Sequence, residues 1–338
     1  MSQRVVYLDY TKGLGIILLL YAHTMNIDEH FSGIWISSFF MPIFFIVSGI
    51  ILSKKFGEVL PTCSDLVNLL KKRLFQLGIP YLFFCLVLTL FYSLLSVVSK
   101  STPNILHYLI RIVSLKGIDS LWFIPTFFFV ELLFVSLLIP RRIGKWLRII
   151  ALLIGILCAG FSVKSDIYLI NFFVRLFVCF SFAYFGFLYS KIQTQNMRII
   201  IFFPLLLIGC GVLLAFYNGP IGLAVLQFNN GWLFILTALL NSFGFILLFN
   251  YLDTKGVRLR LLELFGKNSI VVLCTNNLLI EIIRIIDSKI TDNWLFSSGV
   301  LGSIVFTIIL ITLEIGIIYL TRFKFISFLF GKGKKRRA

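Results

Sequence analysis

The sequence predicts an all-α, polytopic membrane protein, and three observations lead to this prediction. Of the 338 residues, 59% are hydrophobic and only 13% are charged, whereas soluble domains carry about 25% charged residues. The apolar residues form long runs that approach the ~20 residues a helix needs to cross a bilayer. The basic residues, which give a formal net charge of +17, are unevenly distributed among the connections. No linker or change of composition divides the chain, so we expect a single domain, 1–338.

About ten transmembrane helices are predicted from the apolar runs, with the fifth shorter than the others. They cover approximately residues 5–27, 34–53, 75–98, 119–139, 148–163, 169–190, 198–217, 231–252, 268–286 and 297–321. With the N-terminus inside, twenty-four basic residues fall in inner segments and five in outer ones. Cytoplasmic connections are enriched in Lys and Arg, so we expect both termini to be cytoplasmic. The bilayer thus explains the charge, and no nucleic-acid partner is expected.

The first segment, Val5 to Ile27, carries polar residues that a purely structural span would not need. Asp9, Lys12 and His23 interrupt an otherwise apolar run, and ionisable residues in a membrane span are costly and commonly functional. Lys12 and His23 are eleven residues apart, so they share one helix face and lie ~16 Å apart along the axis. This pattern makes both residues candidates for a functional site.

Two outer connections are expected to carry structure of their own. Residues 103–118 begin with a proline and show broken apolar periodicity, which favours an interfacial helix. Residues 218–231 are glycine-rich with a short apolar middle, which favours a re-entrant or surface loop. None of the three histidines has metal-ligand spacing to a partner, and no CxxC pair is present in the spans. We therefore expect no metal site.

The second and third segments contain further candidates. In FFMPIFFIVSGI, Pro42 is expected to kink the helix, while Ser48 and Gly49 favour close helix packing over nucleophilic catalysis. The stretch KKRLFQLGIPY opens with three consecutive bases, residues 71–73. These bases are either a topology signal or ligands for the phosphates of an anionic cofactor, and the residues alone leave both open.

Charged and aromatic residues also occur in later segments. Trp122 stands where an aromatic belt is expected, and Glu131 is the most deeply placed acid of the chain. Glu131 has either a structural partner or a functional one, and both readings remain open. We expect Arg175 to snorkel to the surface and Glu281 to pair locally with a base three residues later.

Four stretches, in order along the chain, resemble signatures of the acyltransferase-3 family of polytopic membrane enzymes that acylate glycans. LDYTKGLGIILLLYAH is similar to the opening motif, a base followed by ten residues and a histidine, here Lys12 and His23. FFMPIFFIVSG, LWFIP and GKNSIVVLCTNN resemble the second-helix, tryptophan and late motifs. Two positions depart from the pattern. Gln76 stands where many relatives have a second arginine, and Asn276 stands where the late motif often ends in histidine.

The resemblance implies an O-acyltransferase that takes an acyl group from cytosolic acyl-CoA, principally acetyl-CoA. The acceptor would be a sugar hydroxyl on a cell-surface polysaccharide or its lipid-linked precursor. Lys12, Arg73 and Lys72 would bind the donor. His23 would act as general base or accept the acyl group itself, and Glu131 would orient it.

The resemblance also gives supporting roles to three residues, Asp9, Trp122 and Asn276. It implies a stand-alone enzyme in the cell membrane, in particular a bacterial cytoplasmic membrane. Two other function classes stay open at this stage: a glycan or lipid exporter of the same topology, and a non-catalytic relative that assembles with other envelope enzymes. The sequence leaves the oligomeric state open.

Overall fold

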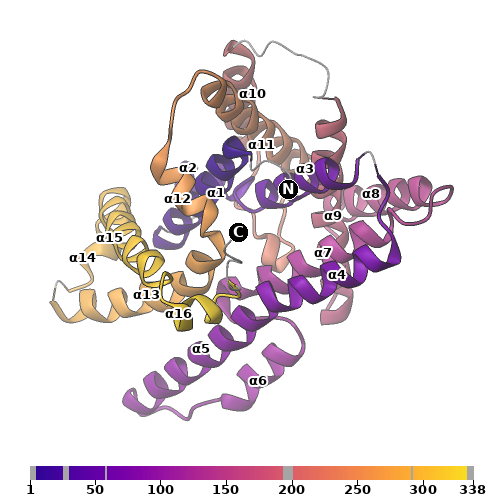
Figure 1. The fold of residues 1–338 in the computed structure, drawn as a ribbon. Coiled ribbons are helices and arrows are strands. Elements are labelled where there is room, and N and C mark those ends of the chain that lie inside the picture. Colours follow the sequence, from indigo (N-terminus) through magenta and orange to yellow (C-terminus); the bar gives the residue numbers. More distant parts are fainter. Residues whose placement is uncertain (1–4, 26–29, 58, 193–200, 291, 333–338) are drawn as a thin grey trace. The chain divides into compact units, whose positions relative to one another are not determined.

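The computed structural model describes residues 5–25, 30–57, 59–192, 201–290 and 292–332. These residues are mostly helical, as Figure 1 shows, and they form no strand, only an isolated bridge between Gly222 and Gln227. The prediction of an all-α fold is therefore confirmed.

The chain forms two compact units from alternating pieces. Unit 1 comprises Met1–Leu66 and Phe129–Ser269, and unit 2 comprises Val67–Phe128 and Ile270–Ala338. Helices α4 (Cys63–Arg73) and α7 (Phe123–Ser136) contribute residues to both. The other helices of unit 1 are α1 (Val6–Thr24), α2 (Phe31–Ser37), α3 (Pro42–Phe56), α8 (Gly144–Gly160), α9 (Tyr168–Ile192), α10 (Phe202–Ala215), η3 (Leu223–Val225), α11 (Gly231–Thr254) and α12 (Arg260–Lys267).

Unit 2 contains the long third segment and the C-terminal helices. Its other helices are η1 (Leu74–Gly78), α5 (Ile79–Val98), α6 (Ile105–Val113), η2 (Asp119–Trp122), α13 (Ser269–Ile290), α14 (Trp294–Ser297), α15 (Gly299–Leu320) and α16 (Lys324–Leu329). The first residue of α13 belongs to unit 1.

Each of the ten predicted segments contains a helix, although residues 26, 27 and 198–200 lie outside the described part. Within the described residues, seven helical runs are long and apolar enough to cross a membrane: Phe31–Phe56, Cys63–Val98, Asp119–Ser136, Tyr168–Ile192, Gly231–Thr254, Ser269–Ile290 and Gly299–Leu320. The first, fifth and seventh predicted segments correspond to α1, which carries polar residues, and to the shorter α8 and α10. A multi-pass membrane fold is thus supported, while the count of ten remains a prediction.

Close helix contacts hold unit 1 together. α3 and α9 approach each other so closely that a Cβ at Gly49 would overlap the backbone of Ala183, and one at Gly186 would overlap the backbone of Ile46. Small residues permit such approach between membrane helices, where dispersion contacts rather than water exclusion drive packing. The predicted packing role of Gly49 is confirmed.

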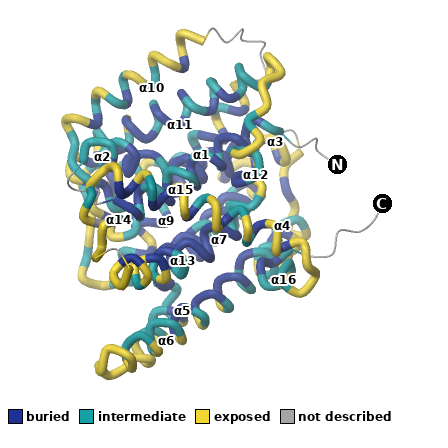
Figure 2. The backbone as a smooth tube through the Cα atoms, turned by 90° about the vertical axis from the view of Figure 1, so that its left-hand side faces the viewer, coloured by how far each residue is buried: buried dark blue, intermediate teal, exposed yellow. Residues whose placement is uncertain are grey.

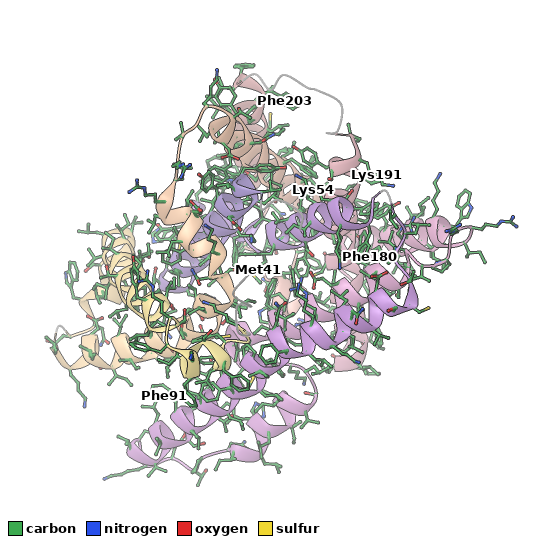
Figure 3. All side chains as sticks on the ribbon, in the orientation of Figure 1. Met41, Lys54, Phe91, Phe180, Lys191 and Phe203 are labelled. Carbon is green, nitrogen blue, oxygen red and sulfur yellow. The ribbon has the colours of Figure 1, made fainter. Side chains whose placement is uncertain are left out.

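The connections of unit 1 gather at two ends. At one end, the Lys54 ammonium lies 5.4 Å from the ring centroid of Tyr7. Figure 3 labels Lys54 and Lys191 at the carboxyl ends of α3 and α9. At the other end, the Ile221 amide donates to Ser37 Oγ at 3.3 Å, and Ser162 Oγ donates to the Asn229 carbonyl at 3.4 Å. These contacts join the start of α1 to the end of α3, and the 218–231 connection to α2 and to the residues that follow α8.

In unit 2, α6 packs along α5, and α13 packs on α15. Tyr81 Oη donates to the Ile112 carbonyl at 2.9 Å, and Asn104 caps α6 by accepting from the His107 amide. The predicted helix in 103–118 is thus confirmed, and its interfacial position remains a prediction. One face of α5 is exposed and apolar, as expected for lipid contact; its residues are Leu82, Leu86, Leu90 and Leu94. Figure 2 shows exposed positions recurring along helices of both units.

Three sequence expectations needed correction or refinement. The second segment is two helices, because the chain leaves α2 and begins α3 afresh at Pro42, which suits a first helical turn. The third helical run starts at Cys63, so the bases at 71–73 lie within a helix rather than before one. Arg175 is only 5% exposed, so the prediction that it snorkels to the surface was wrong. The pairing of Glu281 with Arg284 is confirmed at 2.8 Å.

Candidate active site

In unit 1, α1 places Lys12 and His23 as predicted, on one helix and eleven residues apart. The Lys12 ammonium forms an ion pair with Asp9 at 2.7 Å. The Asp9 side chain is 4% exposed and that of Lys12 is 23% exposed. The buried carboxylate therefore holds a lysine that still reaches the surface of the unit.

α12 fixes this turn of α1. A Cβ at Gly266 would overlap the Asp9 backbone, and one at Gly13 would overlap the Leu262 backbone. Two glycines, one on each helix, thus allow the backbones to touch on either side of Lys12. The GKNS motif begins with Gly266. Two stretches that resemble family signatures therefore pack against each other although they are far apart in the sequence.

His23 lies in the last turn of α1, at the opposite end from Asp9. The helix ends at Thr24, and Met25 is extended. The predicted segment extends to residue 27, so His23 lies closer to the helix end than the sequence indicates. A helix of 19 residues is ~28 Å long, close to the ~30 Å of a hydrocarbon core. The half-buried imidazole therefore stands almost one membrane thickness from the start of α1.

Glu131, on α7, is 2% exposed and accepts a hydrogen bond from Ser48 Oγ of α3 at 3.1 Å. This contact gives Ser48 a hydrogen-bonding role as well as a packing one. A carboxyl group at such a position needs hydrogen-bonding partners, because burial without them is costly. The orientation of His23 by Glu131 remains a prediction.

In unit 2, Arg73 donates from Nη1 to Gln76 Oε1 at 3.0 Å. Gln76, which departs from the family pattern, thus supplies an acceptor where a second arginine would add a charge. Lys72 is exposed and Arg73 is half-buried, directly before the turn at Leu74–Gly78. Both bases remain candidates for an anionic ligand.

Asn276 is fully buried in a small polar network of unit 2. Its Oδ1 accepts from Ser120 Oγ at 3.1 Å and from the Asn277 amide at 2.7 Å, and Asn277 Nδ2 donates to Ser120 Oγ at 2.9 Å. Within the described part of the chain, the Asn276 Nδ2 group is buried without a hydrogen-bond partner, which in a native protein calls for an explanation. Trp122 lies half-buried at the end of η2, two residues after Ser120.

Several polar residues of this network were not singled out from the sequence. Ser120 lies at the start of η2 and Asn277 lies in the third turn of α13, and nothing in the local sequence marks either residue as a member of this network. Thr275 donates to Glu314 at 2.8 Å, which places a fully buried carboxyl group in α15. Within the described residues no cluster of three or more His, Cys, Asp or Glu could hold a metal.

The comparisons with known proteins fit this arrangement. The model of the acyltransferase-3 family, described as an acyltransferase domain, matches residues 5–313. The match includes every residue discussed above except Glu314. Searches of curated proteins and of solved structures found no match to the chain.

Proposed function

Since this chain belongs to the acyltransferase-3 family and is a membrane acyltransferase, we propose that it transfers an acetyl group from cytosolic acetyl-CoA to a sugar hydroxyl. The acceptor is a cell-surface polysaccharide or its lipid-linked precursor, and the enzyme resides in a bacterial cytoplasmic membrane. The observation that carries this proposal is α1, which holds an ion-paired base near one end and an imidazole at the other.

The donor is held through its phosphates by Lys12, Arg73 and Lys72. Charge-assisted bonds from Lys or Arg to phosphate are short and strong, and each of these side chains remains at least partly accessible. Asp9 holds Lys12 in place. The chemistry requires no metal, because the thioester is already an activated acyl group.

His23 acts on the acceptor. Its imidazole takes the proton of the sugar hydroxyl as the oxygen attacks the thioester carbonyl carbon. Collapse of the tetrahedral intermediate breaks the C–S bond, and the imidazolium returns the proton to the CoA thiolate. In the alternative order an imidazole nitrogen attacks the thioester first, and the C–S bond breaks to release the CoA thiolate. The sugar oxygen then takes the acetyl group from the ring nitrogen as the N–acyl bond breaks, and the hydroxyl proton passes to the CoA thiolate.

Glu131 and Asn276 serve in supporting roles. Glu131 orients the His23 ring, with Ser48 fixing the carboxylate. The Asn276 amide, whose Nδ2 has no hydrogen-bond partner among the described residues, donates to an oxygen of the bound substrates. Trp122 packs against the acceptor sugar, as aromatic side chains present an apolar face with a polar edge.

The deciding experiment is incubation of the purified protein with radiolabelled acetyl-CoA and cell-envelope glycans. We expect label to appear on sugar, and alkali to release it as acetate. A glycan or lipid exporter, or a non-catalytic partner protein, would leave the glycans unlabelled, and that result would refute the enzyme assignment.

A further inference from the structure

The third helical run changes its winding directly after Arg73. α4 ends there, a π-helical turn covers Leu74–Gly78, and Pro80 lies in the first turn of α5. Pro80 has no N–H to offer to the carbonyl of Gln76, and its ring crowds that carbonyl. A wider turn relieves the conflict, and π-turns within helices are frequent at functional sites. Gln76 also accepts the hydrogen bond of Arg73.

A C-terminal segment, residues 324–332, packs against this turn. α16 ends in a Schellman motif: the Gly331 amide donates to the Phe328 carbonyl at 2.9 Å, and the Lys332 amide donates to the Ser327 carbonyl at 3.0 Å. Gly331 has a φ of 63°. A Cβ at Gly331 would lie 2.7 Å from both the Cα and the carbonyl oxygen of Gln76, so only glycine fits there.

Side chains anchor the C-terminal segment on both sides of Gly331. The rings of Phe75 and Phe328 meet edge to face at 5.7 Å between centroids, and those of Phe84 and Phe330 lie 4.9 Å apart. Lys332 Nζ donates to Thr321 Oγ1 at 2.9 Å, and burial lowers the pKa of this ammonium group below its ordinary value. The segment is therefore seated on the turn by several independent contacts.

We propose that the C-terminal segment is a positioning element for the acyl-CoA donor, because it fixes Gln76 and thereby the guanidinium of Arg73. This inference rests on the proposed role of Arg73 in binding CoA phosphates. The family match ends at residue 313, so the segment lies beyond the matched domain. Gly331 is the residue on which the contact depends.

The test is equilibrium binding of acetyl-CoA to the purified full-length protein in phosphatidylcholine nanodiscs, whose zwitterionic headgroups do not compete as anionic lipids would. Gly331→Ala should raise the Kd for acetyl-CoA roughly tenfold, the effect of weakening one charge-assisted contact. Gly299→Ala is the matched control. Gly299 has a similar φ of 58°, but an added Cβ there would meet no atom within 4 Å, so its affinity should equal that of the wild type.

Two further variants separate positioning from general destabilisation. Phe328→Ala changes a half-exposed side chain and loosens the segment without straining the backbone, so the Kd should rise even if Gly331→Ala does not fold. In an Arg73→Ala background, Gly331→Ala should add no further loss, because its effect acts through Arg73.

The outcomes are distinguishable. Wild-type affinity in both the Gly331→Ala and Phe328→Ala variants, or full additivity with Arg73→Ala, would overturn the positioning role while leaving the donor assignment intact. A wild-type protein that binds no acetyl-CoA would overturn the proposed donor, and this inference with it.

Discussion

At the scale of single residues, His23 is the side chain on which the proposed chemistry depends most. A positioned base contributes about 10²–10⁴-fold to a proton-transfer step. His23→Ala should therefore reduce transfer of labelled acetyl groups to glycan by at least ~100-fold while acetyl-CoA binding stays near normal. His23→Gln keeps a hydrogen-bonding group but cannot take the proton, so it should be equally inactive.

The control for His23 is His107→Ala, which changes an exposed histidine on α6 and should leave the transfer rate unchanged. If His23→Gln restores most of the activity, His23 has a structural role and the base lies elsewhere.

Lys12 requires a more careful substitution, because its removal takes away the ion pair that it forms with the buried Asp9 carboxylate. Lys12→Met alone would therefore combine lost donor binding with a stability defect. In the double variant Asp9→Asn/Lys12→Met the charge imbalance is gone, so stability should recover. The Kd for acetyl-CoA should stay raised by about ten- to a hundredfold, corresponding to ~1.5–3 kcal/mol for a bond to a charged group.

Melting temperature and acetyl-CoA affinity, measured on the same samples, separate the two effects. Should the double variant bind acetyl-CoA as tightly as the wild type, Lys12 only neutralises Asp9 and its role in donor binding is refuted.

At the scale of elements, the contact of α3 with α9 gives a direct test of packing. Gly49→Val would force its side chain into the Ala183 backbone, and overpacking of this kind costs about 1–3 kcal/mol. We expect a lower melting temperature in detergent and less folded protein. Gly209→Ala on α10 is the control, since no atom lies within 4 Å of an added Cβ and Ala favours the helix. Equal stability of the two variants would contradict the observed helix approach.

The elements also show how far sequence reasoning reaches. The apolar runs located a helix in every predicted segment, and the i, i+3 spacing of Glu281 and Arg284 predicted their ion pair. Pro42 signalled a disturbance, but whether a proline kinks a helix or begins a new one depends on tertiary contacts. Pro80 is a local signal for the turn at 74–78, but the contact of that turn with Gly331 was beyond prediction, because Gly331 lies more than 250 residues away in the sequence.

The candidate site was predictable as a set of residues but not as a set of contacts. Motif resemblance identified His23, Arg73 and Asn276. The hydrogen bond of Arg73 to Gln76 depends on how the helix winds at that turn, and the hydrogen bond of Ser120 to Asn276 joins residues distant in sequence. The burial of Arg175 was missed for the same reason, since a sequence shows a charge in a span but not the helix that covers it.

At the scale of the whole molecule, the predicted topology depends on the charge distribution, and contacts occur at both ends of unit 1. Tyr7 and Lys54 meet at one end, while Ser37, Ile221 and Asn229 take part in contacts at the other. Contacts sort the connections into two sets, but they do not say which set faces the cytoplasm. That assignment depends on the positive-inside rule.

Reporter fusions test this assignment. With both termini cytoplasmic, a fluorescent protein fused at Lys145 or at the C-terminus should fluoresce, and alkaline phosphatase fused at Lys164 should be active, because each reporter works on only one side of the membrane. Exchanging the two reporters at each position is the control and should silence both. A C-terminus found outside would break the count of ten spans. It would also place Arg73 and the C-terminal segment on the membrane face away from cytosolic acetyl-CoA, so the donor assignment would fail together with the topology.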